Sequence, residues 1–184
     1  MKDALTIHRA LLGWEAVHEI VRLPIAMGHA DELPKALGLP AERCLVTRVF
    51  SCGDVFRGPR LLTGVIVPAG GRPSTEAVRL ATGARVVRPA RAGLINSVTE
   101  YAADLVCPLL LPDSMRLLID RRLMDDHAGD DVVYTATGEP STALGIRGRS
   151  LYELCGATPV DLFHPSEKGH ASRPNTPEFR HPVA

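Results

Sequence analysis

Apolar residues recur along this chain with two different periods, one typical of helices and one typical of strands. Spacing of three or four residues predicts helices over residues 4–12, 30–37, 75–82 and 151–155. Gly38, Gly83 and Gly156 directly follow three of these segments, where a glycine commonly ends a helix. The other apolar runs predict strands over residues 16–23, 43–50, 61–67, 85–88, 117–120, 132–135 and near Val160.

The order of these segments predicts the fold class. Strands interrupted by short helices favour a mixed α+β domain, with a mostly antiparallel central sheet flanked by short helices. A doubly wound nucleotide-binding fold is not predicted, because no Gly-x-Gly-x-x-Gly motif follows a strand. A P-loop is not predicted either, because Gly70-Gly71 lacks the lysine of that motif.

The chain changes character after Phe163. Residues 164–184 hold four prolines, three of the seven histidines and almost no aliphatic residues. Such a segment cannot bury enough apolar surface to offset the entropy lost on ordering. We therefore expect one domain over residues 1–163 and a disordered or loosely docked tail over 164–184. Metal binding by the tail histidines is the alternative interpretation.

The charge of the chain is balanced but unevenly distributed. It has 21 basic and 21 acidic residues, so the total gives no indication of nucleic-acid binding. Residues 72–91 nevertheless carry five arginines, Arg72, Arg79, Arg85, Arg88 and Arg91, against the single acid Glu76. Two interpretations stay open: a solvated surface, or a patch that binds phosphates.

Cysteine spacing and hydropathy exclude several classes of protein. The four cysteines form no Cys-x-x-Cys pair and have no histidine at ligand spacing, so neither a zinc site nor a cofactor is predicted. The first residues have no apolar signal core, and no apolar run approaches the length that spans a membrane. We expect a soluble cytoplasmic protein with free thiols and no membrane partner.

Candidate chemistry is concentrated between Asn96 and Leu144. Thr99, Tyr101 and a Cys107-Pro108 dipeptide precede strand-like runs, and Gly138-Glu-Pro-Ser-Thr follows them. Small and turn-forming residues between short strands let the backbone approach a ligand closely. This pattern predicts a binding pocket built from loops on a sheet.

Several local patterns, taken in order, resemble the YbaK family of bacterial aminoacyl-tRNA deacylases, which is related to the editing domain inserted in bacterial prolyl-tRNA synthetase. Residues 99–108 resemble the family's Thr-Gly-Tyr-x-x-Gly-Gly-Val-Ser-Pro loop, and residues 45–50 resemble its first core strand. The resemblance extends over roughly residues 6–162 and is carried by segments 30–38, 45–50, 77–84, 99–108, 117–120, 134–144 and 151–161.

The chain departs from the family at its first core strand. The family usually has a lysine there, followed by a threonine, and Val46 stands at the matching position. Arg48 lies two residues further on and therefore on the same face of the strand. An arginine supplies a cation but not an amine that can lose its proton.

The loops depart from the family as well. Asp104 and Leu105 match the family's paired glycines, Cys107 matches its serine, and Ser141 matches a further glycine. In the family the backbone approaches its ligand at the two paired glycines, and in this chain both positions carry side chains. The pocket should therefore have a different shape, and the resemblance alone does not assign the family's usual substrate to this chain.

The resemblance implies roles for individual residues. Backbone amides near Gly138 would hold the carbonyl oxygen of an ester, and water would attack the carbonyl carbon. Asp104 would bind the substrate ammonium or position water; capping of a turn is its alternative role. Cys107 has no neighbouring base in the sequence, so it is not predicted as a nucleophile. The substrate-binding residues implied are Val46, Arg48, Thr99, Tyr101, Cys107, Pro108, Ser141 and Thr142.

Two functions remain open at this point. The first is a free-standing trans-editing hydrolase that cleaves the ester of a mischarged aminoacyl-tRNA, and the intact order of pocket segments favours it. The second is a non-catalytic aminoacyl-tRNA or nucleotide-binding module of the same fold, or one recruited to a biosynthetic pathway, and the missing lysine favours it. The implied partners are the tRNA acceptor end, with Arg85 and Arg88 on its phosphates, and an aminoacyl-tRNA synthetase. His18 and His29 are interpreted as surface or packing residues.

Overall fold

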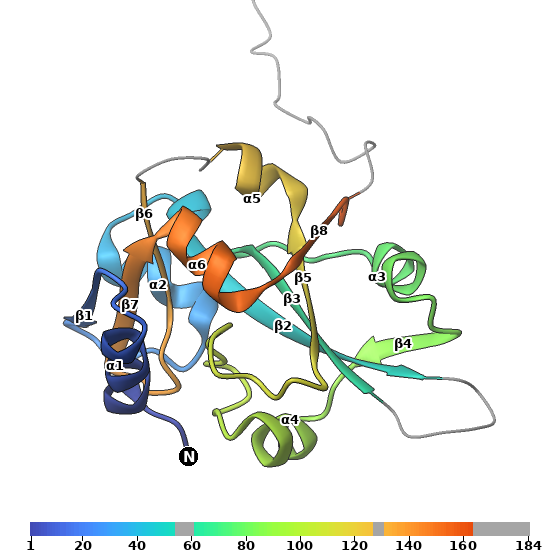
Figure 1. Cartoon of the computed structure of the whole chain (residues 1–184), viewed down its shortest axis with the longest axis horizontal. Coiled ribbons are helices and arrows are strands. Elements are labelled where there is room, and N and C mark those ends of the chain that lie inside the picture. Colours follow the sequence, from blue (N-terminus) through green and yellow to red (C-terminus); the bar gives the residue numbers. More distant parts are fainter. Residues whose placement is uncertain (54–60, 127–130, 164–184) are drawn as a thin grey trace, which may run out of the picture.

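The computed structural model describes residues 1–53, 61–126 and 131–163 (Figure 1). The predicted tail, residues 164–184, lies outside these ranges, so its description stays a prediction. None of the helices in the described part of the chain is long and apolar enough to cross a lipid bilayer.

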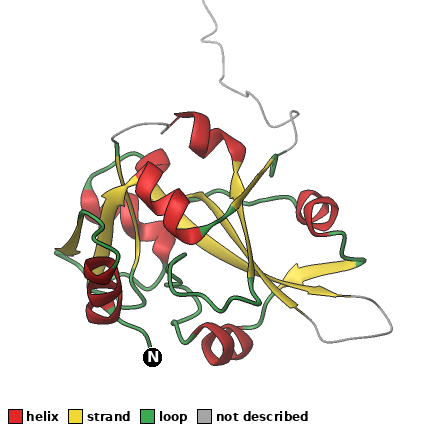
Figure 2. Ribbon diagram, viewed as in Figure 1, coloured by secondary structure: helices red, strands yellow, loops and turns green. Residues whose placement is uncertain are grey.

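The strands form one twisted eight-stranded sheet (Figures 1 and 2). Its order is β1-β7-β6-β2-β3-β5-β8, and β4 pairs with β2 outside this path. The strands are β1 (His18–Arg22), β2 (Cys44–Gly53), β3 (Leu61–Pro68), β4 (Val86–Pro89), β5 (Arg116–Asp120), β6 (Val132–Ala136), β7 (Thr142–Arg147) and β8 (Thr158–Val160).

Short helices cover both faces of this sheet (Figure 2). They are α1 (Ala4–Gly13), α2 (Leu33–Leu37), α3 (Thr75–Thr82), α4 (Ala92–Thr99), α5 (Arg121–Asp126) and α6 (Gly148–Cys155), with two 3-10 turns, η1 (Ala30–Glu32) and η2 (Ala41–Arg43).

Antiparallel and parallel pairings both occur in the sheet. β1 and β6 pair antiparallel with β7, and β3 and β4 pair antiparallel with β2. β2 with β6, β3 with β5, and β5 with β8 are parallel. The predicted fold class, a mixed fold with a mostly antiparallel sheet, is confirmed.

The strand β2 divides the core, because its side chains alternate between the two faces of the sheet. Leu45 and Val49 face the larger core, which α1, α4, α5 and α6 cover. Cys44 and Val46 face the opposite side, where α2 and η1 lie. We call the apolar group on that side the α2 cluster; it contains Leu23, Met27, Ala30, Leu33, Cys44, Val46, Ala69, Leu105, Ala136 and Ala143.

Most predicted elements are present, and four others, including the 3-10 turn η2, were not predicted. Gly38, Gly83 and Gly156 each end a helix with a left-handed backbone, as expected. The helices α4 and α5 and the strand β7 were missed. β7 begins within residues 134–144, one of the segments that carried the family resemblance.

Candidate functional site

Two distant loops meet residues 27–31, which we call the 27–31 segment. The N–H of Met27 donates to the carbonyl of Pro140 over 2.9 Å, and the N–H of Ala30 donates to the carbonyl of Asp104 over 3.0 Å. The segment therefore lies against both loops that the sequence indicated as pocket walls.

Arg48 reaches the same segment from β2. Its Nη2 donates to both carboxylate oxygens of Asp31, at 2.8 and 2.9 Å, and to the carbonyl of Gly71 at 3.1 Å. Asp31 also accepts the N–H of Gly70 over 2.8 Å. Burial of Asp31 works to raise its pKa, but the hydrogen bonds from Gly70 and Arg48 outweigh it, so the pKa is lowered overall. Arg48 thus ties η1 to β2 and to the turn after β3, and its predicted contact with substrate stays a prediction.

Val46 lies two residues before Arg48 on β2 and is 4% exposed. It belongs to the α2 cluster together with Leu105, which is also 4% exposed. These two residues stand where the related family has a lysine and a glycine. The floor under the 27–31 segment is therefore apolar and closely filled.

Asp104 makes a contact with His29 that the sequence did not indicate. Its Oδ1 lies 3.3 Å from Nε2 of His29, and more than half of each side chain is exposed. No sequence spacing connects the two residues, and His29 was interpreted as a surface or packing residue. In a neutral ring, a carboxylate next to Nε2 favours the tautomer that carries its proton on Nε2, which leaves Nδ1 as the hydrogen-bond acceptor. The pair thus presents a polar edge above the apolar floor.

The 138–142 loop is held from two sides. Glu139 Oε2 accepts the N–H of Ala4 at 3.3 Å and the hydroxyl of Thr142 at 3.1 Å. On its other side, the carbonyl of Ser141 accepts the N–H of Leu23 over 2.8 Å. The contacts of Ser141 and Thr142 therefore fix the shape of the loop, and their roles as substrate contacts stay predictions.

Gly138 is required in this loop for two reasons. Its φ is +93°, and a Cβ there would lie 2.6 Å from the carbonyl oxygen of Lys2 and 2.8 Å from Tyr101 Cδ1. Within the part of the chain that the structure describes, its backbone N–H has no hydrogen-bond partner. The N–H of Gly138 is thus available as a donor, as the predicted oxyanion role requires.

Tyr101 and Cys107 belong to the larger core on the opposite face of the sheet. The Tyr101 hydroxyl donates to the carbonyl of Leu109 over 3.0 Å, and burial raises its pKa. Cys107 has no exposed surface, and burial raises its pKa to about 12. Thr99 is buried at the end of α4, where its hydroxyl donates to Ile95 and accepts the N–H of Tyr101. The structure therefore does not bring these three residues into a cleft with Arg48.

Lys2 is a second residue that sequence reasoning missed. Its Nζ donates to the carbonyls of Thr99 at 2.9 Å and Leu110 at 2.6 Å, and lies 3.4 Å from the Glu100 carboxylate. The first residues of the chain thus hold the loop that follows α4 and, through Ala4, the 138–142 loop. No motif near Lys2 could have indicated this contact, because its partners lie about a hundred residues away.

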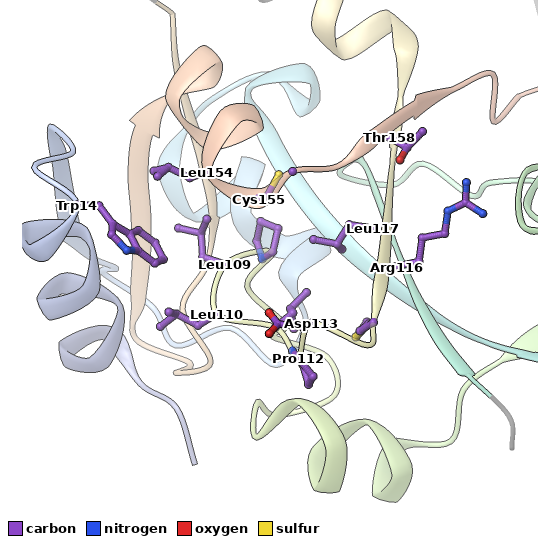
Figure 3. A pocket seen from close by; sticks show the side chains of 14 residues that line it. Trp14, Leu109, Leu110, Pro112, Asp113, Arg116, Leu117, Leu154, Cys155 and Thr158 are labelled. Atoms are coloured by element: carbon purple, nitrogen blue, oxygen red, sulfur yellow. The ribbon is translucent and has the colours of Figure 1, made fainter.

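A cavity of about 530 Å³ lies on the side of the larger core (Figure 3). Trp14, the 108–113 loop, the start of β5 and the end of α6 line it. We call it the Trp14 cavity. Of the predicted site residues, it includes Pro108.

A second cavity, of about 420 Å³, is lined in part by Arg85, Arg116 and the end of α3. Arg88 is exposed on the neighbouring strand β4. Within the described residues, no group of three or more His, Cys, Asp or Glu side chains could hold a metal ion.

Comparison with known proteins identifies the family. The family model described as "Aminoacyl-tRNA editing domain" matches residues 26–154. The chain belongs to the aminoacyl-tRNA editing domain family. The matched range begins at the 27–31 segment and includes Asp104 and the 138–142 loop. No match was found among curated proteins.

Two solved structures share the fold. The hypothetical protein APE2540 is 21% identical, with a TM-score of 0.72 over 85% of this chain and 97% of that one. A candidate trans-editing enzyme for prolyl tRNA synthetase is also 21% identical, with a TM-score of 0.65 over 80% of this chain and 87% of that one. At this identity, the likeness establishes the fold.

Proposed function

We propose that the protein is a free-standing hydrolase that cleaves the ester bond of a mischarged aminoacyl-tRNA. Its family supports an aminoacyl-tRNA substrate, and the carrying observation is the His29–Asp104 pair at the edge of the α2 cluster. Ester hydrolysis needs a base for the attacking water and a donor for the oxyanion. His29 in the 27–31 segment is a candidate for the base, and the 138–142 loop, which contacts this segment through Pro140 and Met27, supplies a candidate for the donor.

His29 is the proposed base. With the Asp104 carboxylate beside Nε2, the neutral ring carries its proton there and keeps Nδ1 free to take a proton from water. The resulting hydroxide oxygen attacks the carbonyl carbon of the ester and gives a tetrahedral intermediate. When the intermediate collapses, the ester C–O bond breaks, and the proton on Nδ1 passes to the leaving ribose oxygen. The products are a free amino acid and an uncharged tRNA.

The N–H of Gly138 is the proposed donor to the oxyanion. Donors that are already fixed in place stabilise the developing negative charge without reorganising. The side chain of the amino acid would rest over Val46 and Leu105. Since both residues already fill the floor, we expect preference for the smallest amino-acid side chains.

A non-catalytic role is the second candidate, and Val46 favours it. An apolar residue at the position of the family's lysine removes an amine from the site. In that case the same surface would bind an aminoacyl-tRNA or a nucleotide without hydrolysing it.

Single-turnover hydrolysis of mischarged tRNA by site variants tests the proposal. His29→Gln and Asp104→Asn should each lower the rate, His29→Gln by roughly 100-fold or more, which is the usual contribution of a general base. Asp161→Asn is the matched control, because Asp161 is an exposed carboxylate just after β8, in a 3.4 Å ion pair with Arg121. Parent-like rates in His29→Gln would exclude His29 as the base. Tight binding of aminoacyl-tRNA by the parent without hydrolysis would establish the second candidate.

A further inference from the structure

The Trp14 cavity has the features of a second binding site. It lies on the face of the sheet that the larger core occupies and shares no residue with the α2 cluster. Its volume, about 530 Å³, falls in the range of pockets that bind small molecules, roughly 300–1,000 Å³. We propose that this cavity binds a nucleotide, with the base stacked on Trp14 and the phosphate beside Arg116. The proposal does not depend on the hydrolase activity.

One end of the cavity is an aromatic and aliphatic surface. The indole of Trp14 is 45% exposed and stands at the rim next to Leu110 and Leu154 (Figure 3). Leu109 and Leu117, which are 1% and 8% exposed, form part of the wall. A flat base stacks favourably on an exposed aromatic ring, and an aliphatic wall excludes water from its other side.

The polar groups lie away from this surface. Figure 3 shows Arg116 on the side opposite Trp14, and the carboxylate of Asp113 between them. Neither Asp113 nor Arg116 forms an ion pair or a side-chain hydrogen bond with another described residue. A carboxylate accepts from the exocyclic amino group of adenine, cytosine or guanine, and a guanidinium binds phosphate. A nucleotide, with one base, one ribose and one phosphate, matches this order of aromatic surface, carboxylate and guanidinium.

The wall between the two ends is fixed in place. Leu110 has a φ of +57°, an unfavourable conformation for a leucine, and its carbonyl accepts from Lys2 Nζ at 2.6 Å. The carbonyl of Leu109 is held by the Tyr101 hydroxyl. A wall that is ordered before the ligand arrives reduces the entropy lost on binding.

Other ligand classes fit less well. The side chains of most free amino acids have no flat face to stack on Trp14, and an amino acid would leave much of the cavity volume unfilled. A fatty acid would fill the apolar end but would leave Asp113 without a donor. A nucleotide satisfies the ring, the carboxylate and the cation together.

The intrinsic fluorescence of the protein gives a direct test, because Trp14 is its single tryptophan. Titration with AMP should quench the emission, and adenosine should do so with lower affinity because it lacks the phosphate. UMP should bind more weakly than AMP, since uracil has no amino group for Asp113. Arg116→Gln should weaken AMP binding while leaving adenosine unaffected. Arg9→Gln, an exposed arginine outside the cavity, should change neither.

Alkylation of Cys155 provides a second readout that does not need the tryptophan. Cys155 lines the cavity and is partly exposed, whereas Cys44, Cys52 and Cys107 are buried. AMP should slow alkylation of Cys155, measured by mass spectrometry of the peptide. Trp14→Leu should weaken this protection, with an affinity loss of roughly 5- to 150-fold, the usual range for one stacked base. Leu12→Ala, which changes an exposed residue of α1 outside the cavity, is the control.

The nucleotide could be a free mononucleotide or part of an RNA, and the affinities of AMP and of the RNA trinucleotide CCA distinguish the two. Similar affinities would indicate a free mononucleotide, and tighter binding of CCA would indicate the single-stranded end of an RNA. The proposal is overturned if neither ligand quenches Trp14 nor protects Cys155 at millimolar concentrations. It is also overturned if Arg116→Gln weakens adenosine and AMP equally.

Discussion

Single residues in this protein have roles that depend on which face of the sheet they occupy. Val46 and Asp104 lie at the α2 cluster and its edge, whereas Tyr101 and Cys107 lie in the larger core. The sequence placed all four in one pocket, because the positions of the related family's first core strand and loop were carried over together. In the structure the same loop crosses from one face of the sheet to the other, with Leu105 in the α2 cluster and Val106 in the larger core.

The thiol of Cys107 should be unreactive and dispensable. A pKa raised to about 12 keeps it protonated at neutral pH, and the side chain has no exposed surface. Cys107→Ala should therefore keep most of the hydrolytic rate of the parent. A covalent adduct on Cys107 after turnover, or loss of the rate in a variant that stays folded, would contradict this.

Gly138→Ala should destabilise the fold. The positive φ costs an alanine about 1–3 kcal/mol, and the new Cβ would press against Lys2 and Tyr101. Urea denaturation measures the difference in unfolding free energy. Gly13→Ala is the control, because no atom lies within 4 Å of the added Cβ, and it should be neutral or slightly stabilising. Equal stability of the two variants would show that the 138–142 loop tolerates a side chain.

At the scale of elements, the Arg48–Asp31 pair connects η1, β2 and the turn after β3. Asp31 has a lowered pKa in the folded protein, so its stabilising effect is fully present above the pKa of the unfolded chain. The effect is lost as the pH falls through the lower, folded-state pKa. The 27–31 segment should therefore loosen in acid.

Asp31→Asn should lower the unfolding free energy near neutral pH by about 1.5–3 kcal/mol, the usual range for hydrogen bonds to a charged group. Below the folded-state pKa of Asp31 the difference from the parent should shrink. Denaturation curves across the acid range measure this trend. Glu153→Gln, which removes an exposed pair with Arg149, should have a small effect at every pH. A difference for Asp31→Asn that does not change with pH would contradict the electrostatic explanation.

Local signals explain which elements could be predicted. Helices ended by Gly38, Gly83 and Gly156 follow a rule that acts within a few residues, and these predictions hold. The helix α4 was missed because Gly93 and the β-branched Ile95, Val98 and Thr99 have low helix propensity. β7 was missed because Gly145 interrupts its apolar pattern; in the sheet, Glu19 and Tyr134 pack over that glycine and require its lack of a side chain.

At the scale of the whole molecule, the fold could be predicted and the site only in part. The order of segments was sufficient to identify the family and the mixed sheet. The contact of His29 with Asp104 and the contacts of Lys2 join residues far apart in the chain, and no local pattern encodes them. Such contacts depend on the assembled sheet and are visible only in three dimensions.

The arginines near α3 and β4 are the proposed docking surface for tRNA phosphates. Replacing Arg85 and Arg88 together with serine should lower affinity similarly for every tRNA. The salt dependence should also become flatter, by about 0.7–0.9 log units per tenfold rise in salt for each phosphate that the variant no longer binds. Arg149→Ser, on the exposed surface of α6, is the control. Unchanged affinity and salt dependence in the double variant would show that this surface faces solvent and does not bind tRNA phosphates.

Hydrolysis across a panel of correctly and incorrectly charged tRNAs tests the central claim most directly. The parent protein should release the amino acid from at least one mischarged tRNA faster than spontaneous hydrolysis does, with preference for small side chains. His29→Gln should lose this acceleration, and Asp161→Asn should keep it. Release at the spontaneous rate for every tRNA in the panel, with the protein folded and binding tRNA, would contradict the hydrolase function.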